Sequence, residues 1–259
     1  MGLTPVWRLR DRPGAASARD AAVDAAPVTP FDTAQDRHHA PLVTDPDDRR
    51  AAIMRMEWPG LKARVSGCTD CPLHATRNKT VFGVGDEAAD WLFVGEGPGA
   101  DEDAQGEPFV GQAGKLLDNM LAAIGLKRGT NVYIANILKC RPPGNRNPDP
   151  HEALQCEPYL HRQIELIRPK LIVALGKVAA ANLLASDASV AAMRSRIHRY
   201  RGIPLIVTYH PAYLLRNLTD KAKAWADLLF AVRTMRDLQG AAPASTSSGS
   251  ELRNHGEQA

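Results

Sequence analysis

The chain has 259 residues, 44% of them hydrophobic, and its formal net charge of +3 at pH 7 neither requires nor excludes a polyanionic partner. No apolar run reaches the length of a membrane span, which argues against a membrane protein. Near the N-terminus, Arg8, Arg10 and Arg12 are followed by a mixture of alanine and aspartate, which is not a secretory signal, so we expect a cytoplasmic protein.

The two ends of the chain differ in composition from its middle. Residues 1–48 are rich in alanine, aspartate, arginine and proline, and residues 240–259 are rich in serine and alanine. Both segments contain few large apolar residues, so we expect disordered or loosely attached extensions. The remaining residues, 49–239, have the length of one domain.

The first half of this domain opens with a helix. A helical pattern over 49–65 is interrupted or ended near Pro59-Gly60, and Cys68-Thr-Asp-Cys71 follows it. Short apolar runs predict strands at 80–84 and 91–94. Beyond a glycine-rich loop, apolar residues at 116, 117, 120, 121 and 124 have helical spacing.

The second half repeats the alternation of strand and helix. Strands are predicted at 131–138, 171–175 and 205–209, because β-branched and other apolar residues fill these runs. Helices are predicted at 151–167, from 176 onward and at 220–238. The proline-rich segment 139–150 is neither a helix nor a central strand.

This alternation is typical of an α/β protein. We predict three layers, α/β/α, with a central, mostly parallel sheet of about four strands and helices on both faces. The strand ends at Gly95, Asn136, Gly176 and His210 should then gather along one edge of the sheet. Glu96, Asn136 and His210, which are far apart in sequence, would face one pocket at this edge.

The loop Gly95-Glu-Gly-Pro-Gly99 stands between a predicted strand and a predicted helix, where open α/β sheets bind ligands. Its spacing is not the dinucleotide fingerprint, and no Gly-Lys-Ser/Thr follows that would make a phosphate-binding loop. The loop carries the carboxylate of Glu96, and Phe109 follows further on. Phe109 alone would be interpreted as a core residue.

The four cysteines are spaced as a Cys-x2-Cys pair followed by two distant single residues: Cys68, Cys71, Cys140 and Cys156. In a cytosolic chain such residues are metal ligands, catalytic groups or small buried residues more often than disulfides. Four thiolates suit tetrahedral zinc and an iron–sulfur cluster equally well, and residue chemistry does not choose between them. A closed site of this kind would be structural.

Basic residues gather around the predicted edge of the sheet. A solvated face and a phosphate-binding surface are both consistent with such a cluster. Its members are Lys139, Arg141, Arg146, Lys177 and Arg216.

Four motifs, taken in order and with the cysteine spacing, resemble the family 4 uracil-DNA glycosylases, the iron–sulfur members of the uracil-DNA glycosylase superfamily. The resemblance covers roughly residues 51–238. The motifs are Gly95-Glu-Gly-Pro-Gly99, Gly106-x-Pro-Phe-Val-Gly111-x-Ala-Gly114, Asn136-Ile-Leu-Lys-Cys-Arg-Pro-Pro143 and His210-Pro-Ala-Tyr-Leu-Leu-Arg216.

The resemblance implies a DNA repair enzyme that hydrolyses the N-glycosidic bond of uracil in single- or double-stranded DNA. It implies a [4Fe–4S] cluster at the periphery of the fold, held by Cys68, Cys71, Cys140 and Cys156. Phe109 would stack on the flipped uracil, and Asn136 would bind the edge of the base. Main-chain N–H groups of Gly95, Glu96 and Gly97 would bind a carbonyl, and His210 would hydrogen-bond uracil O2.

Further roles follow from the same resemblance. Leu214 and Leu215 would wedge into the gap that the flipped base leaves, and Arg216, Lys139 and the other basic residues would hold phosphates. Either Glu96 orients the attacking water, or the reaction is mostly dissociative and needs little activation of the nucleophile. We expect a monomer, nucleoid-associated in the cytoplasm, whose extensions offer a site for a repair or clamp partner.

Two alternatives remain at this point. A cross-linking relative of these enzymes traps the abasic sugar on a histidine in a longer basic loop, whereas the loop 142–148 here is short and has no histidine. The resemblance therefore predicts turnover. A non-catalytic iron–sulfur DNA-binding module would instead bind DNA without releasing uracil.

Overall fold

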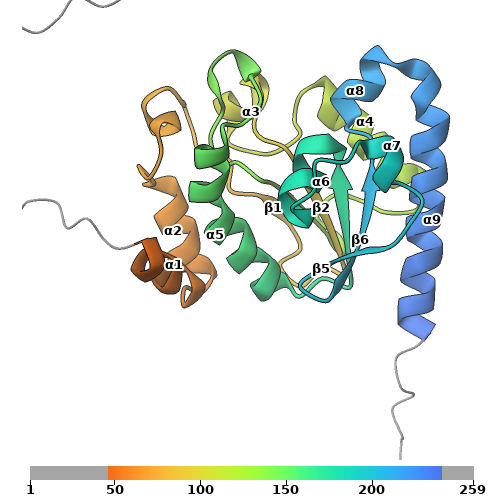
Figure 1. The fold of residues 1–259 in the computed structure, drawn as a ribbon, viewed down its shortest axis with the longest axis horizontal. Coiled ribbons are helices and arrows are strands. Elements are labelled where there is room, and N and C mark those ends of the chain that lie inside the picture. The colour runs from red at the N-terminus through yellow and green to blue at the C-terminus, as the bar shows by residue number, and fades with distance from the viewer. Residues whose placement is uncertain (1–45, 241–259) are drawn as a thin grey trace, which may run out of the picture. The chain divides into compact units, whose positions relative to one another are not determined.

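The computed structural model describes residues 46–240 (Figure 1). The extensions predicted at 1–48 and 240–259 lie outside this range except at their inner ends. Within the described range, no helix combines the length and apolar character that a bilayer span requires.

A six-stranded mixed sheet forms the centre of the fold, in the order β1-β3-β2-β4-β6-β5. The four middle strands are parallel and confirm the four strands expected from their apolar runs: β2 (Trp91–Gly95), β3 (Val132–Asn136), β4 (Leu171–Leu175) and β6 (Ile203–Thr208). The edge strands β1 (Val84–Gly85) and β5 (His198–Tyr200) pair antiparallel to their neighbours. The strand predicted at 80–84 is thus reduced to its last residue, and β5 lacks the apolar pattern that would predict it.

The long helices follow the predicted alternation, except at the start of the domain and in three short helices. The helix expected over 49–65 is two helices, because Pro59 lies in the first turn of the second, where its missing N–H costs nothing. The short helices over 100–105, 190–193 and 211–216 were not predicted. The helices are α1 (Pro46–Met54), α2 (Trp58–Ser66), α3 (Ala100–Gln105), α4 (Gln112–Ala123), α5 (Pro150–Ile167), α6 (Gly176–Leu184), α7 (Val190–Met193), α8 (Pro211–Arg216) and α9 (Lys221–Gly240), with 3-10 turns η1 (Pro72–Ala75), η2 (Pro143–Asn145) and η3 (Leu218–Asp220).

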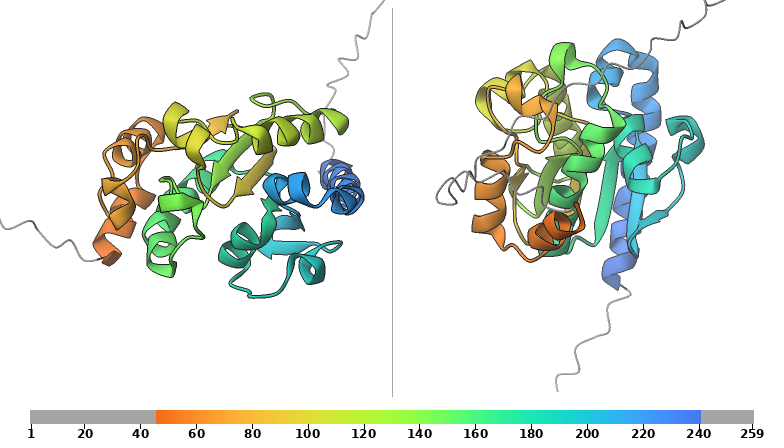
Figure 2. Two further views of the ribbon diagram at one scale, coloured as in Figure 1. Left: turned by 90° about the horizontal axis from the view of Figure 1, so that it is seen from above. Right: turned by 60° about the vertical axis from the view of Figure 1, so that its left-hand side comes forward.

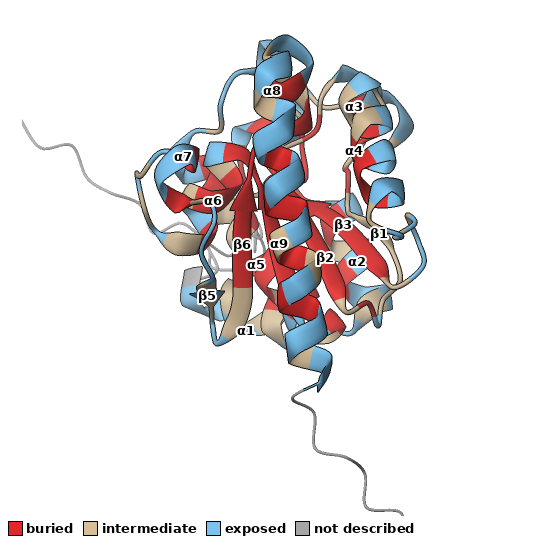
Figure 3. Cartoon of the chain, turned by 90° about the vertical axis from the view of Figure 1, so that its right-hand side faces the viewer, coloured by how far each residue is buried: buried red, intermediate tan, exposed pale blue. Residues whose placement is uncertain are grey.

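Alternate residues of the strands fill two hydrophobic clusters, one on each face of the sheet. Leu92, Val94 and Ile172 pack with residues of α5 and α6, whereas Phe93 and Val173 pack with residues of α4 and α9. Figure 3 shows the middle strands buried behind α9, except at the start of β6, and shows the outer side of α9 exposed. The predicted three-layer α/β/α architecture is therefore confirmed.

A smaller layer covers the outer side of α5. Helices α1 and α2 pack against α5 through a third cluster that includes Ile53, Leu61 and Tyr159, and Figure 2 shows these helices beside it. This contact places the Cys68–Cys71 segment, which follows α2, next to α5.

The chain connections position a crevice at one edge of the sheet. Strand β2 lies between β3 and β4, so the chain leaves β2 toward one neighbour and later returns to the other. Where the winding of a parallel sheet reverses in this way, the loops at the carboxyl ends diverge and leave a crevice. The strands end at this edge with Gly95, Asn136, Leu175 and Thr208, one or two residues from the predicted positions Gly176 and His210 for the last two.

Candidate active site

A cavity of about 410 Å³ lies at this edge of the sheet. Its walls come from the loop after β2, the segment before α4, the end of β3 with its following loop, and the start of α8. Among the residues that line it are Glu96, Phe109, Asn136, Asn145, His210 and Arg216. The structure thus brings Glu96, Asn136 and His210 into one pocket.

Gly95 allows the side chains of Asn136 and Phe109 to approach the end of β2 closely. A Cβ atom at Gly95 would lie 2.5 Å from both Asn136 Oδ1 and Phe109 Cζ, far inside van der Waals contact. Only glycine therefore lets the amide and the aromatic ring approach the same strand end. Gly97 lines the cavity, and a Cβ atom there would make an ordinary contact with Leu138.

The side chain of Asn136 is 2% exposed, and its Oδ1 has no hydrogen-bond partner. A buried amide oxygen without a partner is costly, by about 1–3 kcal/mol. Because Asn136 lines the cavity, a ligand with an N–H donor can satisfy this oxygen. The observation points to a binding role for Asn136.

His210 is the N-cap of α8, and its Nδ1 accepts a hydrogen bond from the Ala212 main-chain N–H at 3.1 Å. A neutral imidazole that accepts at Nδ1 carries its proton on Nε2. The helix cap therefore fixes the tautomer and leaves Nε2–H as the free donor of the ring. The backbone of Gly176, with a φ of +88°, passes so close that a Cβ atom there would lie 2.8 Å from the His210 Cβ.

Burial lowers the pKa of His210 to about 4, and the positive charge of Arg216 contributes in the same direction. An unfolded histidine binds a proton near pH 6.5. As the pH falls from about 6.5 to about 4, the unfolded chain takes up a proton that the folded ring refuses, so this group makes folding less stable over that interval. Above this pH interval the His210 ring is neutral in both the folded and the unfolded chain.

We expect the carbon signals of the His210 ring to titrate with a midpoint near pH 4 in an NMR experiment on ¹³C-histidine-labelled protein. The His210→Asn variant assigns the signal by its disappearance. A midpoint near 6.5 would show that the ring is exposed or ion-paired and would contradict the neutral donor.

Phe109 places its ring beside His210, with ring centroids 5.5 Å apart and the planes tilted by 31°. The residue is 6% exposed and lines the cavity. Its backbone has a φ of +55°, in the left-handed region. Glu102 accepts hydrogen bonds from the N–H groups of Val110 and Gly111 at 2.9 and 3.1 Å, and from Gly99 at 3.0 Å.

Glu96 lines the same cavity, and burial raises the pKa of its carboxyl group. A carboxylate with a raised pKa beside a cavity is a candidate acid–base group or a candidate to orient water.

Four of the five predicted phosphate contacts lie at the cavity or on the surface around it. Arg146 and Arg216 line the cavity, and the guanidinium of Arg146 also pairs with Glu152 at 2.6 Å. Arg141 donates from Nε to Asn145 Oδ1 at 2.7 Å, close to the cavity wall. Lys177 is exposed near the start of α6 but does not line the cavity.

Two of the predicted DNA-contacting residues are buried. Lys139 is 1% exposed, and its ammonium donates to the Asn136 main-chain oxygen at 3.0 Å and to Gln163 Oε1 at 2.7 Å. It supports the end of β3 and does not reach a surface where a phosphate could bind. Leu214 is 1% exposed and belongs to the hydrophobic core, whereas its neighbour Leu215 is 42% exposed. Of the two predicted wedge residues, only Leu215 is on the surface.

The four cysteines are buried and form no disulfide. Cys71, Cys140 and Cys156 share one small cluster with Leu73 and Leu138, so the loop after α2, the end of the β3 segment and α5 meet there. The pKa of the Cys140 thiol is raised to about 11: burial raises it most, Arg77 opposes this, and the charges of Cys71 and Cys68 act in the same direction as burial. Cys68 therefore belongs to the same neighbourhood.

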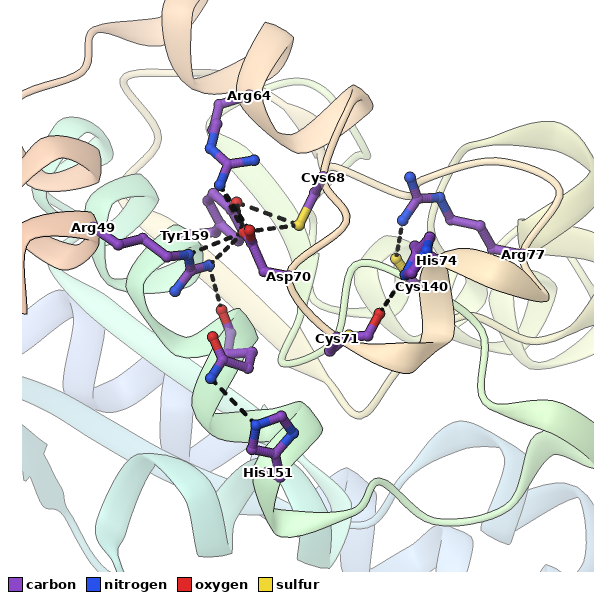
Figure 4. A network of polar contacts seen from close by, with 11 residues as sticks. Arg49, Arg64, Cys68, Asp70, Cys71, His74, Arg77, Cys140, His151 and Tyr159 are labelled. Carbon is purple, nitrogen blue, oxygen red and sulfur yellow. Dashed lines mark hydrogen bonds and ion pairs between the residues drawn. The ribbon is translucent and has the colours of Figure 1, made fainter. Parts of the chain in front are cut away.

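Polar side chains lie next to the buried cysteines (Figure 4). Arg77 donates to Cys140 Sγ at 3.1 Å, and the Tyr159 hydroxyl lies 3.3 Å from Cys68 Sγ and 2.8 Å from a carboxylate oxygen of Asp70. Asp70 also accepts from Arg64 at 2.8 Å. Donors to thiolate sulfur and polar partners around them are typical of the surroundings of a metal cluster.

Thiols dominate the donor set at this position. Among residues 46–240, no three histidine, cysteine, aspartate or glutamate side chains converge as ligands of one ion do. Four buried thiols are a donor set that tetrahedral zinc and an iron–sulfur cluster share, so the residues fit either group.

Sequence reasoning did not find several residues of the site. Glu102 and Asn145 line the cavity, as does Tyr213, whose hydroxyl donates to Asp220 at 2.7 Å. Glu102 follows the glycine loop at the position of a capping-box acid, Gly99-x-x-Glu102, and this signal could have found it. The positions of Asn145 and Tyr213 depend on loop geometry that no local pattern predicts.

A family model described as the uracil DNA glycosylase superfamily matches residues 82–229. This range contains every residue of the cavity discussed above. It also lies within the domain predicted at 49–239.

The chain is also similar to curated proteins named type-4 uracil-DNA glycosylase. That of Archaeoglobus fulgidus is 48% identical over 159 residues, which cover 58% of this chain and 79% of the relative. That of Thermotoga maritima is 45% identical over 162 residues, covering 62% and 84%. That of Pyrobaculum aerophilum is 38% identical over 182 residues, covering 67% and 92%.

Proposed function

The chain belongs to the type-4 family of the uracil-DNA glycosylase superfamily, and we propose that it removes uracil from DNA by hydrolysing the N-glycosidic bond. The products are free uracil and an abasic site. One observation carries the proposal: the Phe109 ring, the unpartnered Asn136 Oδ1 and the free Nε2–H of His210 all face one cavity of about 410 Å³ at the carboxyl edge of the sheet.

Recognition of the base needs a flat surface and a hydrogen-bonding edge. A base in a duplex must first be flipped out of the stack, and the Phe109 ring then offers a stacking platform. Asn136 Oδ1 accepts from uracil N3–H, and its amide N–H₂ donates to O4, whereas cytosine presents the opposite pattern. A site that depends on such hydrogen bonds rejects the wrong base strongly, because the wrong base leaves Asn136 without partners.

Departure of the base is assisted by His210. As the glycosidic bond breaks, negative charge develops on the uracil oxygens. The neutral His210 ring donates from Nε2 to O2 and stabilises this charge more than it stabilises the intact substrate. Main-chain N–H groups in the Gly95–Gly97 loop add to this stabilisation. The neutral imidazole is the right donor, because Nδ1 is already occupied by the cap of α8.

Glu96 is our candidate for orienting the attacking water. Its carboxyl group lines the cavity, and Gly97, which follows it, has no side chain to serve as a base. In a mostly dissociative reaction, activation of the water by Glu96 would contribute little to the rate. A small loss of rate in Glu96→Gln would favour the dissociative course, and a large loss would favour water activation.

The DNA strand is held at the rim of the cavity. Arg146 and Arg216 supply positive charge there, and the exposed Leu215 on α8 is the candidate to occupy the gap left by the flipped base. Arg141 and Lys177 lie further from the cavity and would contact more distant phosphates.

The four cysteine thiolates would hold a [4Fe–4S] cluster. When bound, it supplies a cross-link among the Cys68–Cys71 segment, the loop after β3 and α5. Its role is structural, because the cysteines do not line the substrate cavity.

The test is incubation of the purified protein with a uracil-containing oligonucleotide, single-stranded and double-stranded. We expect free uracil and alkali-labile strand scission at the uracil position, with many turnovers per protein molecule. An adduct that survives SDS would instead identify a cross-linking protein. DNA binding without uracil release would identify a non-catalytic module, and either result would refute the proposal.

A further inference from the structure

Phe109 holds its ring in the cavity from a backbone conformation that phenylalanine rarely adopts. Its φ of +55° lies in the left-handed region, where the Cβ atom of an L-residue crowds the following carbonyl group. Such a conformation is kept only where contacts with the surrounding structure hold it in place. The contacts that hold the main chain around Phe109 therefore decide where the ring lies.

One of these contacts comes from Arg128, which follows α4 in the chain. Its guanidinium donates from one terminal nitrogen to the Pro108 carbonyl oxygen at 2.8 Å and from the other to the Phe109 carbonyl oxygen at 2.7 Å. These are short, charge-assisted bonds to two successive peptide groups. Because the guanidinium is rigid and planar, the pair fixes the relative direction of the two carbonyls.

The other side of Phe109 is held independently. The N–H groups of the next two residues, Val110 and Gly111, donate to the Glu102 carboxylate at 2.9 and 3.1 Å. The Phe109 carbonyl also packs against the first turn of α4, where a Cβ atom at Gly114 would lie 1.8 Å from it. Arg128 thus holds the carbonyl oxygens of the peptide groups before and after Phe109, and Glu102 holds the N–H groups that follow.

Arg128 is itself oriented by acidic residues. Its Nε donates to Asp118 Oδ1 at 3.0 Å, and Glu107 lies 3.6 Å from a terminal nitrogen. Asp118 is half-exposed, so this ion pair alone contributes little stability. One terminal nitrogen also lies 3.0 Å from Asp118 Oδ1. Because each terminal nitrogen carries two N–H groups, both still donate to the carbonyls.

We propose that Arg128 is a positioning residue for uracil recognition: its guanidinium holds the Pro108 and Phe109 carbonyls and so keeps the stacking ring in the cavity. The inference rests on the proposed function, since it takes Phe109 as the surface on which uracil stacks. Arg128 does not line the cavity and does not touch the base.

The experiment compares Arg128→Ala with Arg128→Lys, with Asp118→Asn as the matched control and Phe109→Ala as the reference for complete loss of stacking. The dissociation constant of free uracil is measured by NMR saturation transfer, and the half-saturating concentration of uracil-containing DNA is measured in single-turnover excision. We expect Arg128→Ala to weaken both by about tenfold, equivalent to about 1.4 kcal/mol. Affinity for uracil-free DNA should stay unchanged.

Asp118→Asn removes the ion pair but leaves the two carbonyl contacts, so uracil binding should remain close to that of the wild type. Arg128→Lys keeps the positive charge but replaces a two-pronged contact with a single ammonium, so it should weaken uracil binding without lowering the melting temperature. If Arg128→Ala does not fold, the lysine variant decides the question. Unchanged uracil affinity in the folded variants would overturn the inference.

The same data separate this inference from the proposed function. A wild-type protein that neither binds uracil nor releases it would refute the function itself. A wild-type protein that does both, together with Arg128 variants that bind uracil equally well, would refute only the role of Arg128.

Discussion

Replacing His210 with alanine is expected to slow uracil excision by about two to three powers of ten under single-turnover conditions. This is the usual cost of removing one preorganised donor to a developing oxyanion. The reason lies in the geometry of the ring. Its Nδ1 is committed to the Ala212 N–H, so Nε2–H is the only donor that the imidazole offers the departing base.

His210→Asn provides the matched control, because it separates the cap of α8 from the chemistry. Asparagine is as good an N-cap as any residue, so its side-chain oxygen can accept from the Ala212 N–H and preserve the helix start. Its shorter side chain cannot replace Nε2 as a donor into the cavity. We expect the asparagine variant to melt like the wild type and to excise uracil as slowly as the alanine variant.

A near-normal excision rate in either His210 variant would remove the residue from the catalytic set. A lower melting temperature in His210→Ala, with activity retained in His210→Asn, would show that the ring serves only as a helix cap. Affinity for uracil-free DNA serves as the reference for both proteins, since His210 lines the cavity that we assign to the base.

The position of the site was predictable because a parallel sheet brings its carboxyl ends to one edge. Gly95 and Asn136 pair directly in the register of β2 and β3, although they are far apart in the sequence. Alternation of strands and helices, with a loop rich in glycine after a strand, was sufficient for this result. The pocket shared by Glu96, Asn136 and His210 follows from topology alone.

Side-chain direction was less predictable on short elements. Helix α8 has six residues, too few for a helical pattern to show that Leu214 faces the core and Leu215 faces solvent. Lys139 lies in a basic, proline-rich segment, a pattern that suggested an exposed side chain. The side chain turns inward to Gln163, a partner on α5 that is distant in sequence.

The backbone around Phe109 was not predictable either. A left-handed φ at a phenylalanine contradicts its local preference, and it is imposed by contacts with Glu102 and Arg128. Those partners lie on α3 and after α4, so their convergence depends on the completed fold. Functional sites are where such conflicts between local preference and tertiary structure are expected.

The second large effect is expected at Cys140. We predict that Cys140→Ser abolishes the brown absorbance at about 400 nm that an iron–sulfur cluster gives the purified protein. A zinc site would give no such band in the wild type. Serine is nearly the same size as cysteine, so the substitution tests the thiolate with little change in packing volume.

Loss of the cluster should also loosen the segment that it cross-links. Metal binding to a structural site contributes on the order of 10 kcal/mol to folding in small metal-dependent domains, comparable with the whole stability of a typical domain of about 5–15 kcal/mol. Residues 68–77 contain two of the proposed ligands and η1 but few other core residues. We expect their amide hydrogens to exchange rapidly in Cys140→Ser, whereas those of β2 and β4 stay protected by the two hydrophobic clusters.

Wild-type protein stripped of its cluster by an oxidant and a chelator is the matched control, because it reaches the cluster-free state without a substitution. Its absorbance and its exchange in residues 68–77 should match those of Cys140→Ser. If the variant keeps the band at about 400 nm, Cys140 is not a ligand. If both cluster-free proteins keep residues 68–77 protected, the buried contacts of Tyr159 and Asp70 alone hold this segment to α5, and the structural role of the cluster is refuted.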